Sequence, residues 1–160
     1  MIPRLLLIAL GAALSLPAQK DKWEGPQPPK PDLLYLMHAD NLAPTEVTEA
    51  TPETRKDGEA HSIPGASSPA RTPLAGPILL LRAEKLAPEK LALFRFAVVK
   101  GRREVFFSKR RPKDSTRPIR FSVRRFAEGI VRLEVDESLE NGEYGFSPDG
   151  SQQVFAFQVY

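Results

Sequence analysis

The chain has 160 residues and a formal net charge of +3, and it contains no cysteine. Its length excludes a string of several large domains, because one domain commonly takes roughly 100–200 residues. The absence of cysteine excludes disulfides, a thiol nucleophile, a lipid-anchor cysteine and cysteine-ligated metal sites. We therefore expect a fold that is held together by packing alone.

Residues 1–18 have the layout of a secretory signal peptide. One basic residue, Arg4, precedes the uncharged apolar run 5–14, and Pro17 and Ala18 follow it. The run is shorter than the roughly 20 residues that a membrane-spanning helix needs. The alternative, a buried N-terminal helix, requires an amphipathic face that the run lacks. We expect cleavage near Ala18 and a secreted or periplasmic protein without an integral membrane span.

The next stretch, 19–31, is predicted to be a proline-rich tether. Four of the seven residues from Gly25 to Pro31 are proline, a composition that favours an extended, semi-rigid spacer. The remaining residues, 32–160, are predicted to form one domain.

The first part of this domain has the pattern of short strands. Residues 33–37 are an apolar run of strand length. The pair Asp57-Gly58 is a strong turn signal and is predicted to join 45–54 to 59–63 in a hairpin. Residues 64–77 contain four prolines and two glycines, so we expect an irregular connection there.

The second part predicts a strand every few residues. One helical turn is expected at 87–91, and tight turns at Lys100-Gly101 and at 148–150. The expected strands are 78–82, 91–99, 103–108, 119–126, 130–135, 142–146 and 153–160. Short strands separated by turn signals indicate a sandwich or barrel. We predict an all-β domain: a single antiparallel β-sandwich of seven to nine strands, without a helix longer than two turns.

Alternation along these strands also predicts the core. Its expected members are Leu34, Leu36, Leu79, Leu81, Phe94, Phe96, Val105, Phe121, Val123, Val131, Leu133, Tyr144, Phe155 and Phe157.

The segment from Leu139 through Gly142 to Tyr144 resembles the tyrosine corner of immunoglobulin-like and fibronectin-type sandwiches, where a tyrosine hydroxyl bonds back to the upstream backbone. The disulfide and core tryptophan of antibody domains are missing, since the one tryptophan, Trp23, falls in the tether. Gly-Glu-Tyr at 142–144 followed by the strand 154–157 is also similar to uncharacterised secreted bacterial β-sandwich domain proteins. This resemblance covers roughly residues 78–160 and implies an immunoglobulin-like fold and a compartment, but no activity.

The charges are divided unevenly along the chain. Residues 100–132 hold twelve basic and three acidic residues, a net charge of +9, whereas 133–160 hold six acidic residues and no basic one. Five of the cations fall between two expected strands and are predicted to form an exposed loop: Lys109, Arg110, Arg111, Lys113 and Arg117. Such a surface attracts anionic polymers in a salt-dependent way. The alternatives are a solvated loop and pairing of the basic stretch with the acidic segment.

The sequence carries no catalytic motif. It has no nucleophile elbow, no phosphate-binding glycine loop and no metal-binding histidine spacing, and its histidines are His38 and His61 alone. We therefore expect a non-catalytic extracytoplasmic module for binding or scaffolding, without a cofactor or metal. Its partner is an unknown protein or an anionic polymer. Sequence-specific nucleic-acid recognition is not expected, because the phenylalanines alternate as core residues do. The alternative is a small secreted hydrolase or metal-binding protein that uses His38 or His61.

Overall fold

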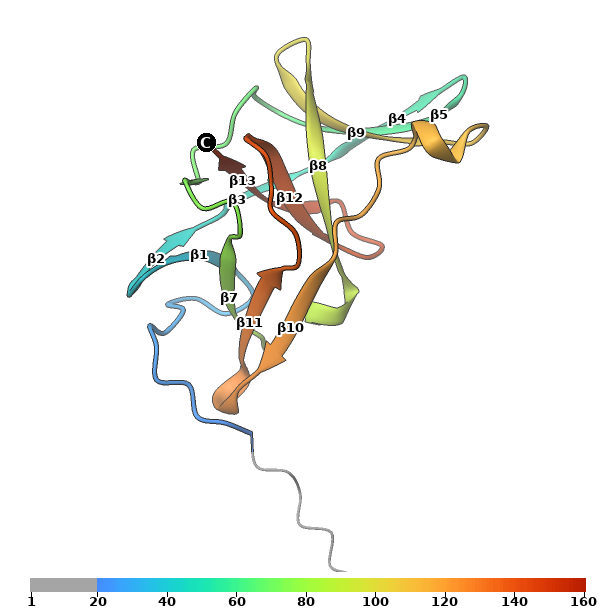
Figure 1. The fold of residues 1–160 in the computed structure, drawn as a ribbon. Helices are drawn as coiled ribbons and strands as arrows, with labels where there is room; N and C mark the ends of the chain where they lie inside the picture. The colour runs from blue at the N-terminus through green and yellow to red at the C-terminus, as the bar shows by residue number, and fades with distance from the viewer. Residues whose placement is uncertain (1–19) are drawn as a thin grey trace, which may run out of the picture.

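The computed structural model describes residues 20–160, so the predicted signal peptide at 1–18 lies outside the described residues. This part of the chain is all β, with three single turns of 3-10 helix as its only helical pieces (Figure 1). The strands are β1 Leu34–His38, β2 Asn41–Pro44, β3 Glu46–Glu49, β4 Thr51–Arg55, β5 Gly58–Ile63, β6 Arg71–Thr72, β7 Ile78–Arg82, β8 Leu91–Val99, β9 Arg102–Ser108, β10 Phe121–Arg125, β11 Ile130–Val135, β12 Gly142–Pro148 and β13 Gln153–Val159. The 3-10 turns are η1 Pro88–Lys90, η2 Pro112–Asp114 and η3 Ala127–Gly129. No helix of the described part is both long and apolar enough to cross a membrane.

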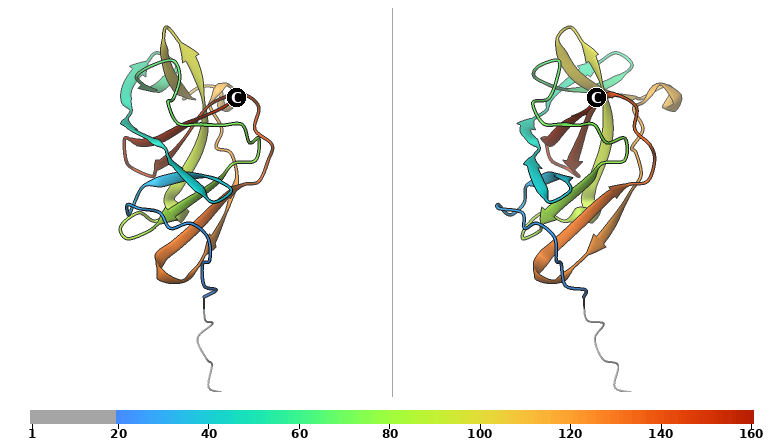
Figure 2. Two further views of the ribbon diagram at one scale, coloured as in Figure 1. Left: turned by 90° about the vertical axis from the view of Figure 1, so that its left-hand side faces the viewer. Right: turned by 60° about the vertical axis from the view of Figure 1, so that its left-hand side comes forward.

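The strands form two sheets that pack face to face (Figures 1 and 2). The five-stranded sheet has the order β10-β11-β7-β1-β2. The eight-stranded sheet has the order β3-β13-β12-β8-β9-β5-β4, with β6 added beside β13. All pairs are antiparallel except β6 with β13, which is parallel. The predicted two-sheet antiparallel fold is therefore present.

The main core lies between β1, β7 and β11 of the five-stranded sheet and β8, β12 and β13 of the other. Its aromatic centre is Phe146, which stacks near Phe157 with ring centroids 6.3 Å apart. Eleven of the fourteen predicted core residues are buried. The exceptions are Phe94, Phe121 and Val123, which are only partly buried. Phe121 and Val123 belong to the edge strand β10, where one side of the strand has no neighbour to cover it.

The eight-stranded sheet curls back on itself to form a half-barrel. Only Ala50 separates β3 from β4, yet β3 pairs with β13 and β4 pairs with β5, at opposite ends of the strand order. The Ala50 amide donates a 2.7 Å hydrogen bond to the carbonyl of Gln152, which ties the bend to the start of β13. The curl encloses a second apolar cluster, made of Ile63, Phe96, Val105, Val154 and Ala156.

The prediction of seven to nine strands was wrong, since the described part has thirteen. The extra strands lie between 41 and 72, where the sequence predicted one hairpin and a long irregular connection. They are short and polar, so they lack the apolar alternation that reveals a strand. The hairpin expected at Asp57-Gly58 is confirmed for its second half, because β4 pairs with β5, whereas 46–49 pairs with β13 instead.

The other turns follow the sequence closely. Lys100 and Gly101 both adopt positive φ angles, 51° and 77°, and join β8 to β9. Gly150, with φ of 70°, closes the turn between β12 and β13. The predicted helical turn at 87–91 is η1.

The segment from residue 20 to the start of β1 contains no strand, but it lies against the domain. The Trp23 ring meets the edge of Phe126 at a centroid distance of 4.8 Å. Asp21 pairs with Arg124 at 3.1 Å, and the Lys30 amide donates to the Tyr35 hydroxyl. The predicted tether therefore contacts the domain near its start, at Asp21 and Trp23, and near its end, at Lys30.

Candidate functional site

The predicted basic loop, residues 109–117, leaves the end of β9 and contains η2. Its neck is closed by hydrogen bonds: the Ser108 amide donates to the Ser115 hydroxyl at 2.7 Å, and the Thr116 amide donates to the Phe106 carbonyl at 2.7 Å. At its start, the Lys109 amide donates to the Asp57 carbonyl at 2.8 Å. The loop is thus fixed to the turn between β4 and β5.

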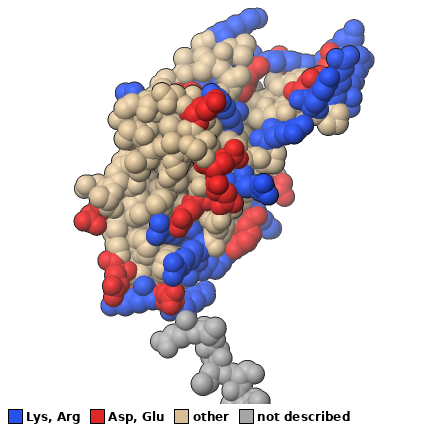
Figure 3. Space-filling model, in the orientation of Figure 1, with Lys and Arg blue, Asp and Glu red and all other residues tan. Residues whose placement is uncertain are grey.

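All five predicted cations of this loop are exposed. Arg110 pairs with Asp57 at 3.1 Å, and within residues 20–160 none of the other four has a carboxylate within ion-pair distance. Figure 3 shows Lys and Arg side chains gathered over the projection at the upper right, where Figure 1 draws η2 and the β4–β5 turn. The loop does not pair with the acidic segment 133–160, which was the alternative left open by the sequence.

Elsewhere in the stretch five of the seven cations are ion-paired, whereas the exposed Lys100 and Arg120 have no carboxylate within ion-pair distance in residues 20–160. Arg125 contacts Glu89, Arg102 contacts Glu53 at 3.1 Å, and Arg132 contacts Glu134 at 2.8 Å. These pairs are exposed or partly exposed, so water screens their attraction and each contributes little to stability. The basic loop therefore differs from the rest of the stretch in that four of its five cations have no carboxylate partner in residues 20–160.

The two histidines lie on different sheets. His38, on β1, is 2.9 Å from the Thr72 hydroxyl. His61, on β5, has Nε2 2.8 Å from a Glu59 oxygen and Nδ1 3.3 Å from the Gln152 side-chain oxygen. No group of three or more metal-ligating side chains occurs in the described part of the chain. Both ring nitrogens of His61 are already engaged, and neither contact is to a hydroxyl nucleophile.

The segment predicted to be a tyrosine corner has the expected contact. The Tyr144 hydroxyl donates a 2.7 Å hydrogen bond to the carbonyl of Glu140, and both Tyr144 and Leu139 are buried. Gly142 lies under the guanidinium of Arg95, where a side chain would meet the Arg95 Nε at 3.2 Å. This cluster anchors the start of β12.

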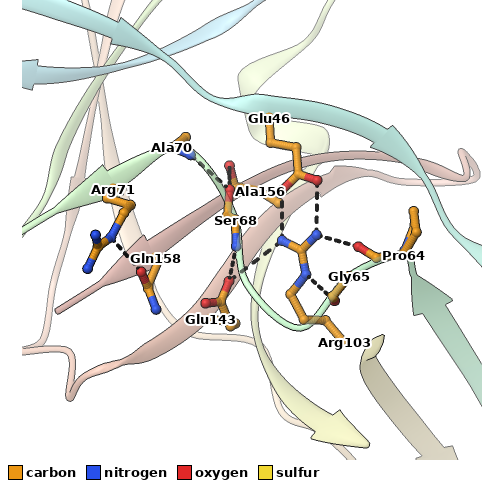
Figure 4. Close-up of polar contacts among 10 residues, drawn as sticks. All are labelled: Glu46, Pro64, Gly65, Ser68, Ala70, Arg71, Arg103, Glu143, Ala156 and Gln158. Atoms are coloured by element: carbon orange, nitrogen blue, oxygen red, sulfur yellow. Dashed lines mark hydrogen bonds and ion pairs between the residues drawn. The ribbon is translucent and has the colours of Figure 1, made fainter. Parts of the chain in front are cut away.

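A buried polar network that the sequence did not reveal closes one end of the curled sheet (Figure 4). Its centre is Arg103 on β9, whose side chain is 1% exposed. The guanidinium donates two hydrogen bonds to Glu46 on β3, at 2.7 and 2.9 Å, and further ones to the carbonyls of Pro64 and Gly65. It also lies 3.6 Å from Glu143 on β12. Arg103 thus cross-links three segments that are distant in sequence.

The two carboxylates of this network differ in their surroundings. Burial works to raise the pKa of Glu46, but hydrogen bonds from Arg103 and Ser68 outweigh it and hold that pKa below its ordinary value. Burial raises the pKa of Glu143, against the Ser68 amide, which donates to it at 2.9 Å, and the charge of Arg103. Its other oxygen, Oε1, is buried without a hydrogen-bond partner in the described residues.

The opposite end of the curled sheet opens as a cavity of about 630 Å³. Its walls include Phe94, Phe96, Val105, Phe107 and Val154, and its mouth lies between η1 and the β12–β13 turn. The Phe94 and Phe107 rings meet edge to face at 5.5 Å, and the His61 ring meets Phe107 at 5.8 Å. The cavity therefore joins an aromatic wall to one hydrogen-bonded histidine.

No protein-family model matches the chain, and comparisons with curated proteins and with solved structures found no similar protein. The chemistry of the site therefore has to be argued from this molecule alone.

The sequence contained a signal for both the Arg103 network and the cavity. Arg103 has the same strand phase as Val105 and Phe107, so alternation places it on their face. Glu143 has the phase opposite to Tyr144 and therefore leaves the main core for the inner face of the curl. Alternation does not show, however, that this second face of the eight-stranded sheet is enclosed.

Proposed function

We propose that the chain is an exported, non-catalytic binding module that holds an anionic polymer on its basic loop. The observation that carries the proposal is the set of four exposed cations without carboxylate partners, Lys109, Arg111, Lys113 and Arg117, on a loop with a closed neck. Such cations remain hydrated and cost the fold little. When they bind a chain of phosphate, sulfate or carboxylate groups, they displace the cations condensed on that polymer, and the release of these counterions favours binding.

The fixed neck supports the same function. A loop held by backbone hydrogen bonds loses less conformational freedom on binding than a mobile one does, and this reduces the cost of association. The loop projects from the body of the domain (Figure 3), so a long polymer can reach its charges without meeting the rest of the surface.

We further propose that the sandwich is immunoglobulin-like, in agreement with the resemblance around Tyr144. The orders β1-β7-β11-β10 and β9-β8-β12-β13 follow the A-B-E-D and C′-C-F-G orders of variable-type domains. In this interpretation β2–β6 are an insertion between the first two strands, and the basic loop follows strand C′. In variable domains that end of the sandwich carries the binding loops. This support rests on the analogy of fold alone.

The test is to replace three of the unpaired cations, Lys109, Arg111 and Lys113, together by Ser and measure retention on heparin and affinity for single-stranded DNA at several salt concentrations. The slope of log affinity against log salt should fall by about two, since each lost phosphate contact removes about 0.7. The charge-matched control replaces Lys20, Lys22 and Lys30, which are also exposed and lie far along the chain from the loop.

Both triple variants should melt within a few degrees of the wild type, because exposed substitutions typically change the free energy of unfolding by less than about 0.5 kcal/mol each. Equal weakening in both variants would reduce the effect to net charge and refute a localised site. Binding to vesicles of anionic lipid, without binding to either polymer, would show that the loop binds a membrane surface and would overturn the anionic polymer as its partner. No binding to any of the three would refute the proposal.

A further inference from the structure

The fold does not need this cavity to be filled, because the members of the second apolar cluster that form its floor are already buried. Phe96, Val105 and Val154 are 7%, 5% and 3% exposed and form its floor. Phe94 and Phe107, which form its wall, remain only partly buried. Their uncovered ring surface faces a space of about 630 Å³.

We propose that this cavity binds a small uncharged molecule with an aromatic ring. Cavities that hold small ligands commonly measure roughly 300–1,000 Å³, are lined mainly by apolar and aromatic groups, and contain a few polar groups that orient the ligand. This cavity meets each of these conditions. The site is separate from the basic loop and does not depend on its function.

The wall favours a ring over an alkyl chain. Phe94 and Phe107 are inclined at 74°, and His61 and Phe107 at 68°, so the three side chains form a series of edge-to-face contacts. Aromatic pairs prefer such edge-to-face or offset arrangements, which contribute about 0.5–1.5 kcal/mol beyond the burial of their area. A ring in the cavity extends this series.

The polar groups favour a neutral ligand that forms hydrogen bonds. The lining includes His61, Gln152 and Ser147, and its charged groups are Glu89, Lys90 and Asp149. Glu89 already contacts Arg125, so one base and one acid remain at the mouth. No excess of either sign selects an ion. The Gln152 side-chain amide, of which His61 engages only the oxygen, can donate a hydrogen bond to a polar group on a ring, and the Ser147 hydroxyl oxygen can accept one from an N–H or O–H.

The probe is N-phenyl-1-naphthylamine, an uncharged fluorescent amine whose emission rises and shifts to the blue in apolar surroundings. The variant Ala92→Trp fills the cavity from its wall, since Ala92 lines it. The matched control is Ala97→Trp, on the same strand but exposed and outside the lining. We expect saturable one-to-one binding to the wild type, at least tenfold weaker binding to Ala92→Trp, and affinity within twofold of the wild type for Ala97→Trp.

Three results would overturn the proposal. The first is no saturable binding to the wild type, and the second is equal binding by the two tryptophan variants. The third is displacement of the probe by 1-decanol at lower concentration than by 1-naphthol, which would assign the cavity to alkyl chains. If Ala92→Trp fails to fold, the methyl chemical shifts of the wild type, recorded with and without the probe, test the proposal instead. The probe should move the signals of Ala50, Ala92, Val105 and Val154, and changes confined to other methyls would refute the site.

Discussion

Replacing Arg103 by Met is expected to destabilise the domain strongly. Methionine keeps an unbranched side chain that reaches about as far as the Arg103 Nε and has no charge, so the change leaves Glu46 and Glu143 in the interior without their cation. It also removes the hydrogen bonds that the carbonyls of Pro64 and Gly65 accept from the guanidinium. Because Arg103 joins β9 to β3 and to the loop after β5, the curl of the sheet loses its internal cross-link.

The magnitude follows from the burial. Removing one partner of a buried ion pair commonly costs about 3–5 kcal/mol, because the other charge is left uncompensated. For a domain of this size each kcal/mol lowers Tm by roughly 3 °C, so we expect a fall of about 10–15 °C. The loss should shrink at acidic pH, where Glu46 without its cation takes up a proton.

The measurement is thermal and urea unfolding, followed by circular dichroism and by Trp23 fluorescence. The control is Arg125→Met, which breaks an exposed, solvent-screened pair with Glu89 and should leave Tm nearly unchanged. Glu46→Gln should lower the free energy of unfolding less in the Arg103→Met variant than in the wild type, because in the variant it removes a carboxylate that has already lost its cation. The reasoning is refuted if Arg103→Met is no more harmful than Arg125→Met.

Two further outcomes are expected. Tyr144→Phe removes the 2.7 Å hydrogen bond to the Glu140 carbonyl and should lower the free energy of unfolding by about 1 kcal/mol. Tyr160→Phe, at a side chain that is 52% exposed, should leave it unchanged, and equal effects would contradict a structural role for the corner. Glu143 has a pKa raised by burial, so the folded protein holds this proton more tightly than the unfolded chain, and its contribution to stability falls as pH rises through the raised pKa. Glu143→Gln removes that fall, so the stability of the variant relative to the wild type should increase as pH rises above the ordinary glutamate pKa of 4.5. A difference that stays constant from acidic to neutral pH would contradict the raised pKa.

The sequence by itself determined the all-β class, most of the core and the tight turns. Alternation at 130–135 and 153–159 fixes which side chains face inward, because successive residues of a strand point to opposite sides. Glycine at 101 and 150 marks positions where the chain turns with positive φ. These features depend only on neighbouring residues, so they can be recognised locally. The exposed position of the basic loop is of the same kind, since its cations cannot be buried without partners.

Only the tertiary structure decided what covers the second face of the eight-stranded sheet. The curl depends on the pairing of β3 with β13 and of β4 with β5. Alternation along a strand does not show which other strand it pairs with. Once the sheet closes, Arg103 becomes a buried cross-link, and Phe94 and Phe107 become the wall of a cavity. The physical reason is that strand phase gives the side to which a side chain points, whereas burial depends on which distant segment comes to lie on that side.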